Sequence, residues 1–109
     1  MPSIVVTYKK KALSRRQIAA LANVLFSRAC RKDLIWSENL NVYMREVGKF
    51  DRQYGDVIVH IAADSRYHCT TFEEEMHIKN EITKIVLELA PLSGVFVEVM
   101  GASAAAALA

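Results

Sequence analysis

The sequence is poor in the features that mark secreted, disulfide-stapled or membrane-spanning proteins. It holds two cysteines, Cys30 and Cys69, without a CxxC spacing, so we expect reduced thiols in a cytoplasmic protein. No apolar run approaches the roughly 18 residues of a membrane span, and the first residues lack the basic-then-apolar order of a secretion signal. These absences predict a cytoplasmic protein with no membrane partner.

A strong excess of either charge is also lacking. The net charge is +2, and the basic residues are spread between Lys9 and Lys84 in short clusters, which argues against a nucleic-acid partner. Just over half of the residues are apolar and about a quarter are charged, as in ordinary globular proteins. A chain of 109 residues is long enough for one core without metal or disulfide support.

Three histidines and two cysteines raise the question of a metal site. His60, His68, His77, Cys30 and Cys69 show neither the i, i+4 nor the paired spacing that metal sites favour, so we expect no metal. His60 falls within a predicted strand and is interpreted as a core histidine. A catalytic Cys–His pair also needs a third, orienting group, and the sequence indicates none.

The first half of the chain predicts a strand, a helix and a strand. Residues 3–8 are rich in β-branched side chains and end at a lysine run, as a strand leaving the core does. Ser14 and Gln17 form a capping box, so a helix begins at Arg15, and its apolar positions recur at three- and four-residue steps to about Arg31. Residues 39–45 then alternate between polar and apolar side chains, as a half-buried strand does.

The second half repeats this order. Residues 56–63 are almost continuously apolar, which predicts a central strand covered on both faces. Thr71 and Glu74 offer a second capping box, and Pro91 ends the helix that follows. Residues 95–100 form the last strand. The apolar side of this second helix is predicted to hold Ile78, Ile82, Ile85 and Leu89.

The fold class that follows is α/β (α+β), with duplicated β-α-β units forming a four-stranded mixed sheet. We expect one domain over residues 1–100, made of halves at about 2–47 and 56–100, and an alanine-rich tail at 101–109. Right-handed β-α-β connections would place both helices on one face of the sheet. The strands also carry apolar residues at successive positions, such as Val5 and Val6, and therefore on both faces of the sheet. The face without helices would expose apolar side chains, which predicts self-association.

The position of Pro2 carries a chemical implication. If an aminopeptidase removes Met1, which a short second residue normally permits, Pro2 becomes a secondary amine at the end of a buried strand. An ordinary α-amino group titrates at roughly pH 7.7–8.0, and an apolar pocket near cations lowers that pKa. Such an amine could take a proton from carbon next to a carbonyl group.

An N-terminal proline opening a strand and two β-α-β halves together resemble the tautomerase superfamily, which includes 4-oxalocrotonate tautomerase, 5-carboxymethyl-2-hydroxymuconate isomerase and macrophage migration inhibitory factor. The isomerase branch is most similar, through the loop and strand GKFDRQYGDVIVHI at residues 48–61. The resemblance implies a cofactor-independent tautomerase in which Pro2 moves a proton on an enol or keto acid. It also implies a homotrimer whose sheets line a central barrel.

The resemblance further implies an arginine that holds the substrate carboxylate, as the planar guanidinium fork suits such pairing. The second-strand positions aligned to it are Asn39 and Asn41, which carry no charge. Arg45, Arg52 and Arg66 could substitute, and Arg66, which follows the third strand, is the first choice. Dicarboxylate substrates are therefore less favoured than in the family.

Three aromatic side chains complete the candidate site. Tyr43, Phe50 and Tyr54 could line an apolar pocket, and a tyrosine hydroxyl could donate a hydrogen bond to a developing enolate; core packing or a subunit contact is an equal interpretation. Two non-enzymatic alternatives stay open. One is a ferredoxin-like sandwich that binds a ligand, with interleaved halves and paired first and third strands. The other is a tautomerase fold whose activity has decayed, as Asn39 and Asn41 would suggest.

Overall fold

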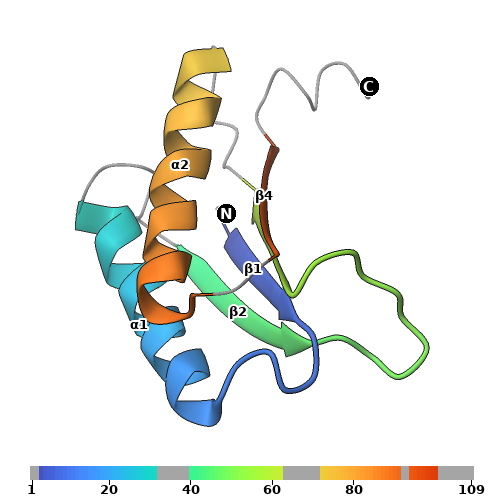
Figure 1. The fold of residues 1–109 in the computed structure, drawn as a ribbon. Helices are drawn as coiled ribbons and strands as arrows, with labels where there is room; N and C mark the ends of the chain where they lie inside the picture. Colours follow the sequence, from blue (N-terminus) through green and yellow to red (C-terminus); the bar gives the residue numbers. More distant parts are fainter. Residues whose placement is uncertain (1–2, 32–39, 63–71, 92–93, 101–109) are drawn as a thin grey trace.

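The computed structural model describes residues 3–31, 40–62, 72–91 and 94–100, and within these ranges it contains all six predicted elements (Figure 1). They follow the predicted order: β1 Ser3–Tyr8, α1 Arg15–Arg31, β2 Asn41–Glu46, β3 Val57–Ala62, α2 Phe72–Leu89 and β4 Val95–Met100. The sequence therefore predicted the number, type and order of these elements correctly.

The four strands form one mixed sheet in the order β2-β1-β3-β4. β1 pairs with β2 in parallel, and β3 pairs with β4 in parallel, so each half of the chain pairs its own two strands. This arrangement contradicts the ferredoxin-like alternative. β1 also pairs with β3, in antiparallel orientation, and this pairing joins the halves. Contrary to our expectation, pairing of the first and third strands does not distinguish the two folds.

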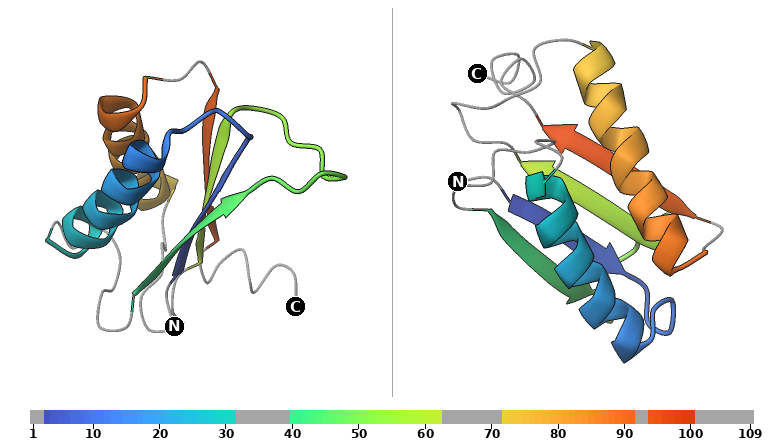
Figure 2. Two further views of the ribbon diagram at one scale, coloured as in Figure 1. Left: turned by 90° about the horizontal axis from the view of Figure 1, so that it is seen from below. Right: turned by 90° about the vertical axis from the view of Figure 1, so that its left-hand side faces the viewer.

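Both helices lie against the same face of the sheet (Figure 2). Alternate strand residues point into this layer, and the helices contribute a matching apolar stripe. The fully buried side chains of the resulting core include Ile4, Val6, Leu21, Leu25, Val57, Val59, Ile82, Ile85 and Val86. Burial of these side chains is the main favourable term in folding, at roughly 25 cal/mol per Å² of apolar surface.

The prediction that the third strand is covered on both faces is wrong for the single chain. Val57, Val59 and Ile61 are buried beneath the helices, whereas His60 and Ala62 are exposed. The reason is that the two helices supply one layer, and successive strand residues point to opposite faces. Alternate residues of this nearly continuous apolar run therefore lie on the face covered by the helices and on the open face.

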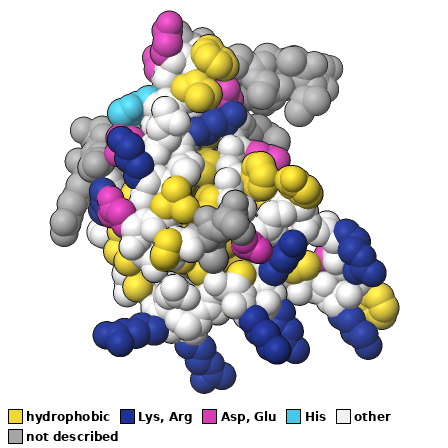
Figure 3. All heavy atoms as spheres, viewed as in Figure 1, with side chains coloured by type: hydrophobic (Ala, Val, Ile, Leu, Met, Phe, Trp, Pro, Cys, Tyr) yellow, Lys and Arg dark blue, Asp and Glu magenta, His cyan; other side chains and the backbone are white. Residues whose placement is uncertain are grey.

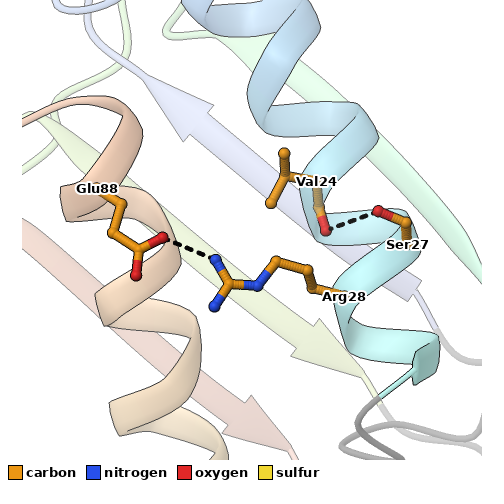
Figure 4. Close-up of polar contacts among 4 residues, drawn as sticks. All are labelled: Val24, Ser27, Arg28 and Glu88. Atoms are coloured by element: carbon orange, nitrogen blue, oxygen red, sulfur yellow. Dashed lines mark hydrogen bonds and ion pairs between the residues drawn. The ribbon is translucent and has the colours of Figure 1, made fainter.

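Local hydrogen bonds fix the start of α1, as the capping box predicted. The backbone N–H of Ser14 donates to Gln17 Oε1 at 2.8 Å, and the backbone N–H of Gln17 donates to Ser14 Oγ at 3.1 Å. Further along, Arg28 Nη1 lies 2.7 Å from Glu88 Oε2 and joins α1 to α2, while Ser27 Oγ contacts the Val24 carbonyl (Figure 4).

The apolar side of α2 is also as predicted. Ile78, Ile82 and Ile85 are buried, and Leu89 packs against the same core while partly exposed. Thr71, the first residue of the second predicted capping box, lies outside the described residues. Neither described helix is long and apolar enough to cross a membrane.

Candidate active site

The sheet face away from the helices is the part of the fold that carries candidate site residues, and no described helix covers it (Figure 2). Strand register sets the side chains of this open face in rows. The row nearest the start of β1 holds Asn41, Ser3 and Ala62; the middle row holds Tyr43, Val5, His60 and Glu98; the last row holds Arg45, Thr7, Ile58 and Phe96. This uncovered, partly apolar face was predicted from the sequence.

A first hollow of about 210 Å³ lies on the open face beside the start of β1. Its walls come from three strands: Ser3 and Val5 of β1, His60, Ile61 and Ala62 of β3, and Glu98 and Val99 of β4. Pro2 is outside the described residues, but its peptide bond joins it to Ser3. The hollow therefore adjoins the residue that follows the predicted catalytic proline.

His60 and Glu98 are the ionisable side chains of this first hollow. His60 Nδ1 lies 3.1 Å from Glu98 Oε2, across the β3–β4 pair, and the His60 side chain is 50% exposed. The interpretation of His60 as a core histidine is thus wrong, because its parity in β3 places it on the open face. Sequence reasoning did not single out this pair. The available signal was that His60 alternates with the buried Val59 and Ile61.

A second hollow, of about 400 Å³, lies where the loop 47–56 meets the open face. Arg52, Gln53 and Tyr54 of the loop line it together with Thr7, Val47, Asp51, Ile58 and His60. Gln53 Nε2 donates to the Thr7 carbonyl at 3.1 Å and so fastens the loop to the end of β1. His60 lines both hollows.

The other predicted site residues lie along β2 and in the following loop. Asn41 stands opposite Ser3, and Tyr43 stands opposite Val5. Arg45 stands opposite Thr7, with its guanidinium carbon 5.5 Å from the centre of the Tyr43 ring. The last row lies four positions along β1 from the first, a distance of about 13 Å at 3.3 Å per residue. Asn41 and Tyr43 thus lie nearer to the start of β1 than Arg45 does.

Phe50 and Arg52 belong to the loop that projects from the sheet on the side away from the helices (Figures 1 and 2). Phe50 is 86% exposed and has the Lys49 ammonium 5.6 Å from its ring centre. Arg52 is exposed and donates to the Asp51 carbonyl at 3.0 Å. The predicted residues Asn39 and Arg66 lie outside the described residues.

Basic side chains gather at the end of the molecule where β1 and β2 finish and α1 begins (Figure 3). The exposed residues that contribute there are Lys9, Lys10, Lys11, Arg15, Arg16, Arg45, Lys49 and Arg52, with Glu46 and Asp51 among them. Because these cations outnumber the carboxylates, this end attracts anions. The second hollow lies at this basic end. Within the described ranges, no group of three His, Cys, Asp or Glu side chains could hold a metal ion.

Comparison with known proteins gives similarity in structure only. No model of a protein family matches the chain, and no curated protein matches it in sequence. A member of the cis-3-chloroacrylic acid dehalogenase family aligns with 89% of this chain and 72% of its own, at a TM-score of 0.66 and 17% identity. A fused 4-OT wild-type symmetric trimer aligns with 96% of this chain and 98% of its own, at a TM-score of 0.65 and 13% identity.

A third similar structure is macrophage migration inhibitory factor from Giardia lamblia, which aligns with 91% of this chain and 97% of its own. Its TM-score is 0.60 and its identity is 11%. Such low identities carry the fold and not the activity. Together with the strand order and the helices on one face, they show that this chain has a tautomerase-like α+β fold.

Proposed function

We propose that this chain is a cofactor-independent tautomerase that moves a proton between carbon and oxygen of a small enol or keto acid. Pro2, freed by removal of Met1, serves as the base in one direction and the acid in the other. The observation that carries the proposal is the first hollow on the open face. It is lined by Ser3, the residue joined to Pro2, in a fold shared with tautomerase-type structures.

The surroundings of the first hollow suit an amine base. Val5 and Ala62 contribute apolar side chains to its wall, and apolar surroundings disfavour the protonated form of an amine. In the forward direction the Pro2 nitrogen takes the proton from the carbon next to the carbonyl group, and the carbonyl oxygen becomes an enolate. With Met1 still attached, this nitrogen is an amide and has no usable lone pair.

The substrate carboxylate needs a cation or several hydrogen-bond donors. Arg66 remains our first choice for this role, with Arg52 and Arg45 as alternatives. Arg52 is supported by its position in the second hollow at the basic end. On β2, Asn41 stands opposite Ser3 and Tyr43 stands opposite Val5, and both are proposed as substrate contacts. Phe50 of the projecting loop is proposed as a further contact.

We also propose that the protein works as a cytoplasmic homotrimer. The open face is uncovered in the described chain and carries apolar side chains, including Val5, Ile58 and Phe96. One structure with the same fold is a symmetric trimer. Association of three copies through this face would shield these side chains from water, which is the usual reason for oligomer formation.

Two measurements test the catalytic proposal. Intact mass spectrometry shows whether Met1 is removed, and turnover of phenylenolpyruvate and 2-hydroxymuconate is compared between wild type and Pro2→Ala. Alanine is also short enough to permit removal of Met1, so the variant keeps a free amine but loses the proline ring. We expect Pro2→Ala to lower kcat/KM by about 100-fold or more. Unchanged turnover would remove Pro2 from the mechanism.

A decayed tautomerase fold that only binds a ligand is the second candidate. It is favoured by Asn41, which stands beside Ser3 at a position where the resemblance to the tautomerase superfamily implies an arginine. Binding of phenylpyruvate without turnover, by correctly processed wild-type protein, would support this candidate over the enzyme.

A further inference from the structure

We propose that His60, oriented by Glu98, is the second proton-transfer group of this site and acts on the substrate oxygen while Pro2 acts on carbon. This inference rests on the proposed function and adds to it the partner that balances the proton transfer. Without such a group, removal of a proton from carbon leaves a negative charge on oxygen. A positioned acid at that oxygen lowers the barrier by general acid catalysis.

Strand register places His60 within reach of a substrate held at the start of β1. His60 stands opposite Val5, and Ser3 stands opposite Ala62, so His60 and Ser3 are diagonal neighbours on the open face. Such neighbours have Cα atoms about 7–8 Å apart, a gap that a histidine ring and a small substrate fill. Both residues line the first hollow.

The contact with Glu98 determines which ring nitrogen faces the substrate. His60 Nδ1 lies 3.1 Å from Glu98 Oε2, a distance at which an Nδ1–H group donates to the carboxylate. A neutral ring held in this way leaves Nε2 as an acceptor, and a protonated ring presents Nε2–H as a donor. Glu98 is therefore a positioning residue, since it acts through His60.

The proton balance of the step is closed. For a keto acid, the C–H bond breaks and an N–H bond forms on Pro2, while Nε2–H of His60 breaks and an O–H bond forms on the substrate. The products are the enol, a protonated Pro2 and a neutral His60, and proton exchange with water returns both groups to their starting states before the next turnover. For an enol acid the same bonds form and break in reverse, and no oxidant, metal or further reactant is required.

Charged and titratable groups surround His60 from two elements besides its own strand. Glu98 faces it from β4, and Asp51, Arg52 and Tyr54 of the loop line the second hollow with it. The neighbour on β1 is the apolar Val5. An exposed contact between polar side chains usually contributes little to stability, so removal of the contact between His60 and Glu98 should leave the free energy of unfolding almost unchanged. What singles out His60 is that it lines both hollows and contacts Glu98 in the first.

The test uses variants that keep shape and remove proton transfer. His60→Asn keeps an N–H donor near the position of Nδ1 but has no group at Nε2. Glu98→Gln keeps an acceptor but removes the charge. Glu88→Gln is the matched control, because it removes the carboxylate of the Arg28 ion pair on the helical side of the molecule. Circular dichroism and sedimentation verify that each variant is folded and assembled as wild type.

We expect His60→Asn to lower kcat about 100-fold and to remove one limb of the pH profile of kcat/KM. Glu98→Gln should cause a smaller loss and move the same limb, and the double variant should be no slower than His60→Asn within about twofold, as for residues that act as a unit. Glu88→Gln should match wild type in rate and pH profile.

The outcomes separate this inference from the proposed function. Full activity of His60→Asn beside an inactive Pro2→Ala would overturn the role of His60 and leave that of Pro2. Loss in His60→Asn with none in Pro2→Ala would overturn Pro2 and support His60. If no variant turns over substrate, the ¹⁵N ring signals of His60 decide the matter on addition of phenylpyruvate. We expect a shift in wild type and in Glu88→Gln, and unchanged signals would overturn the inference.

Discussion

At the residue scale, two hydrogen bonds hold the first turn of α1. Ser14 and Gln17 each satisfy a backbone N–H of the other, so two of the donors left unpaired at a helix start are occupied. Both partners are in the same stretch of chain. The start of this helix could therefore be predicted from sequence to the residue.

Removal of this cap should destabilise the protein. We expect Ser14→Ala to lower the free energy of unfolding by about 1 kcal/mol, measured by urea denaturation. Ser27→Ala is the matched control, because the Ser27 hydroxyl bonds back to the Asn23 carbonyl at 2.9 Å inside the helix and caps no free donor. Serine has a lower helix propensity than alanine in a helix interior, so the Ser27→Ala substitution should be neutral or slightly stabilising. Equal losses in the two variants would contradict the capping argument.

Gly55 is a second residue whose role is local. It has φ +96°, a backbone conformation that side chains disfavour, and a Cβ there would lie 2.7 Å from the Phe96 ring. We expect Gly55→Ala to cost about 1–3 kcal/mol of unfolding free energy. Gly48→Ala should cost less, because its added Cβ meets the movable Asp51 carboxylate. Equal midpoints for the two variants in thermal unfolding would count against this argument.

The candidate site shows where residue-level prediction stops. Pro2 could be proposed from the sequence because its position in the chain is itself the signal. The contact between His60 and Glu98 was not predicted, because the two residues are 38 positions apart in the sequence and only the β3–β4 register brings them to 3.1 Å. Arg45 and Arg52 could be named from their charge, but their distance from the start of β1 depends on β2 and on the loop that follows it.

At the element scale, the limits of α1 and of the first and last strands in the sequence were predictable, whereas those of the second and third strands were less so. β1, α1 and β4 have the predicted bounds. β2 begins at Asn41 rather than at residue 39, and β3 begins at Val57 rather than at residue 56. β2 is paired over its six residues with the six of β1, so its length is set by the partner strand rather than by its own composition.

The amphipathic character of α2 leads to a prediction of its own. Ile82 is fully buried, and Leu87 on the same helix is 40% exposed. We expect Ile82→Ala to lower the free energy of unfolding by about 2–5 kcal/mol, because it leaves a cavity in the core. Leu87→Ala should cost much less, and the difference is measured by urea denaturation of the two variants. Similar losses would mean that the apolar stripe was assigned to the wrong side of the helix.

At the scale of the whole molecule, the two faces of the sheet differ in their exposure to solvent. The helices bury the middle of one face, where Ile4, Val6, Val57 and Val59 lie, while the described chain leaves the other face open, with Phe96 43% exposed on it. The sequence could predict this asymmetry, because two helical segments suffice for one layer only and both strand parities are apolar. It could not predict which charged groups meet on the open face, since that depends on the strand order β2-β1-β3-β4.

If the open face is the subunit interface, a charge placed on it should separate the subunits without unfolding them. We expect Phe96→Lys to reduce the mass measured by sedimentation velocity from that of a trimer to that of a monomer, because a lysine ammonium would have to be desolvated in the interface. Phe26→Lys is the matched control, since Phe26 is 49% exposed but lies on α1, on the helical side. It should leave the mass unchanged. A wild-type monomer, or loss of assembly in the Phe26 variant alone, would show that the open face is not where this chain associates.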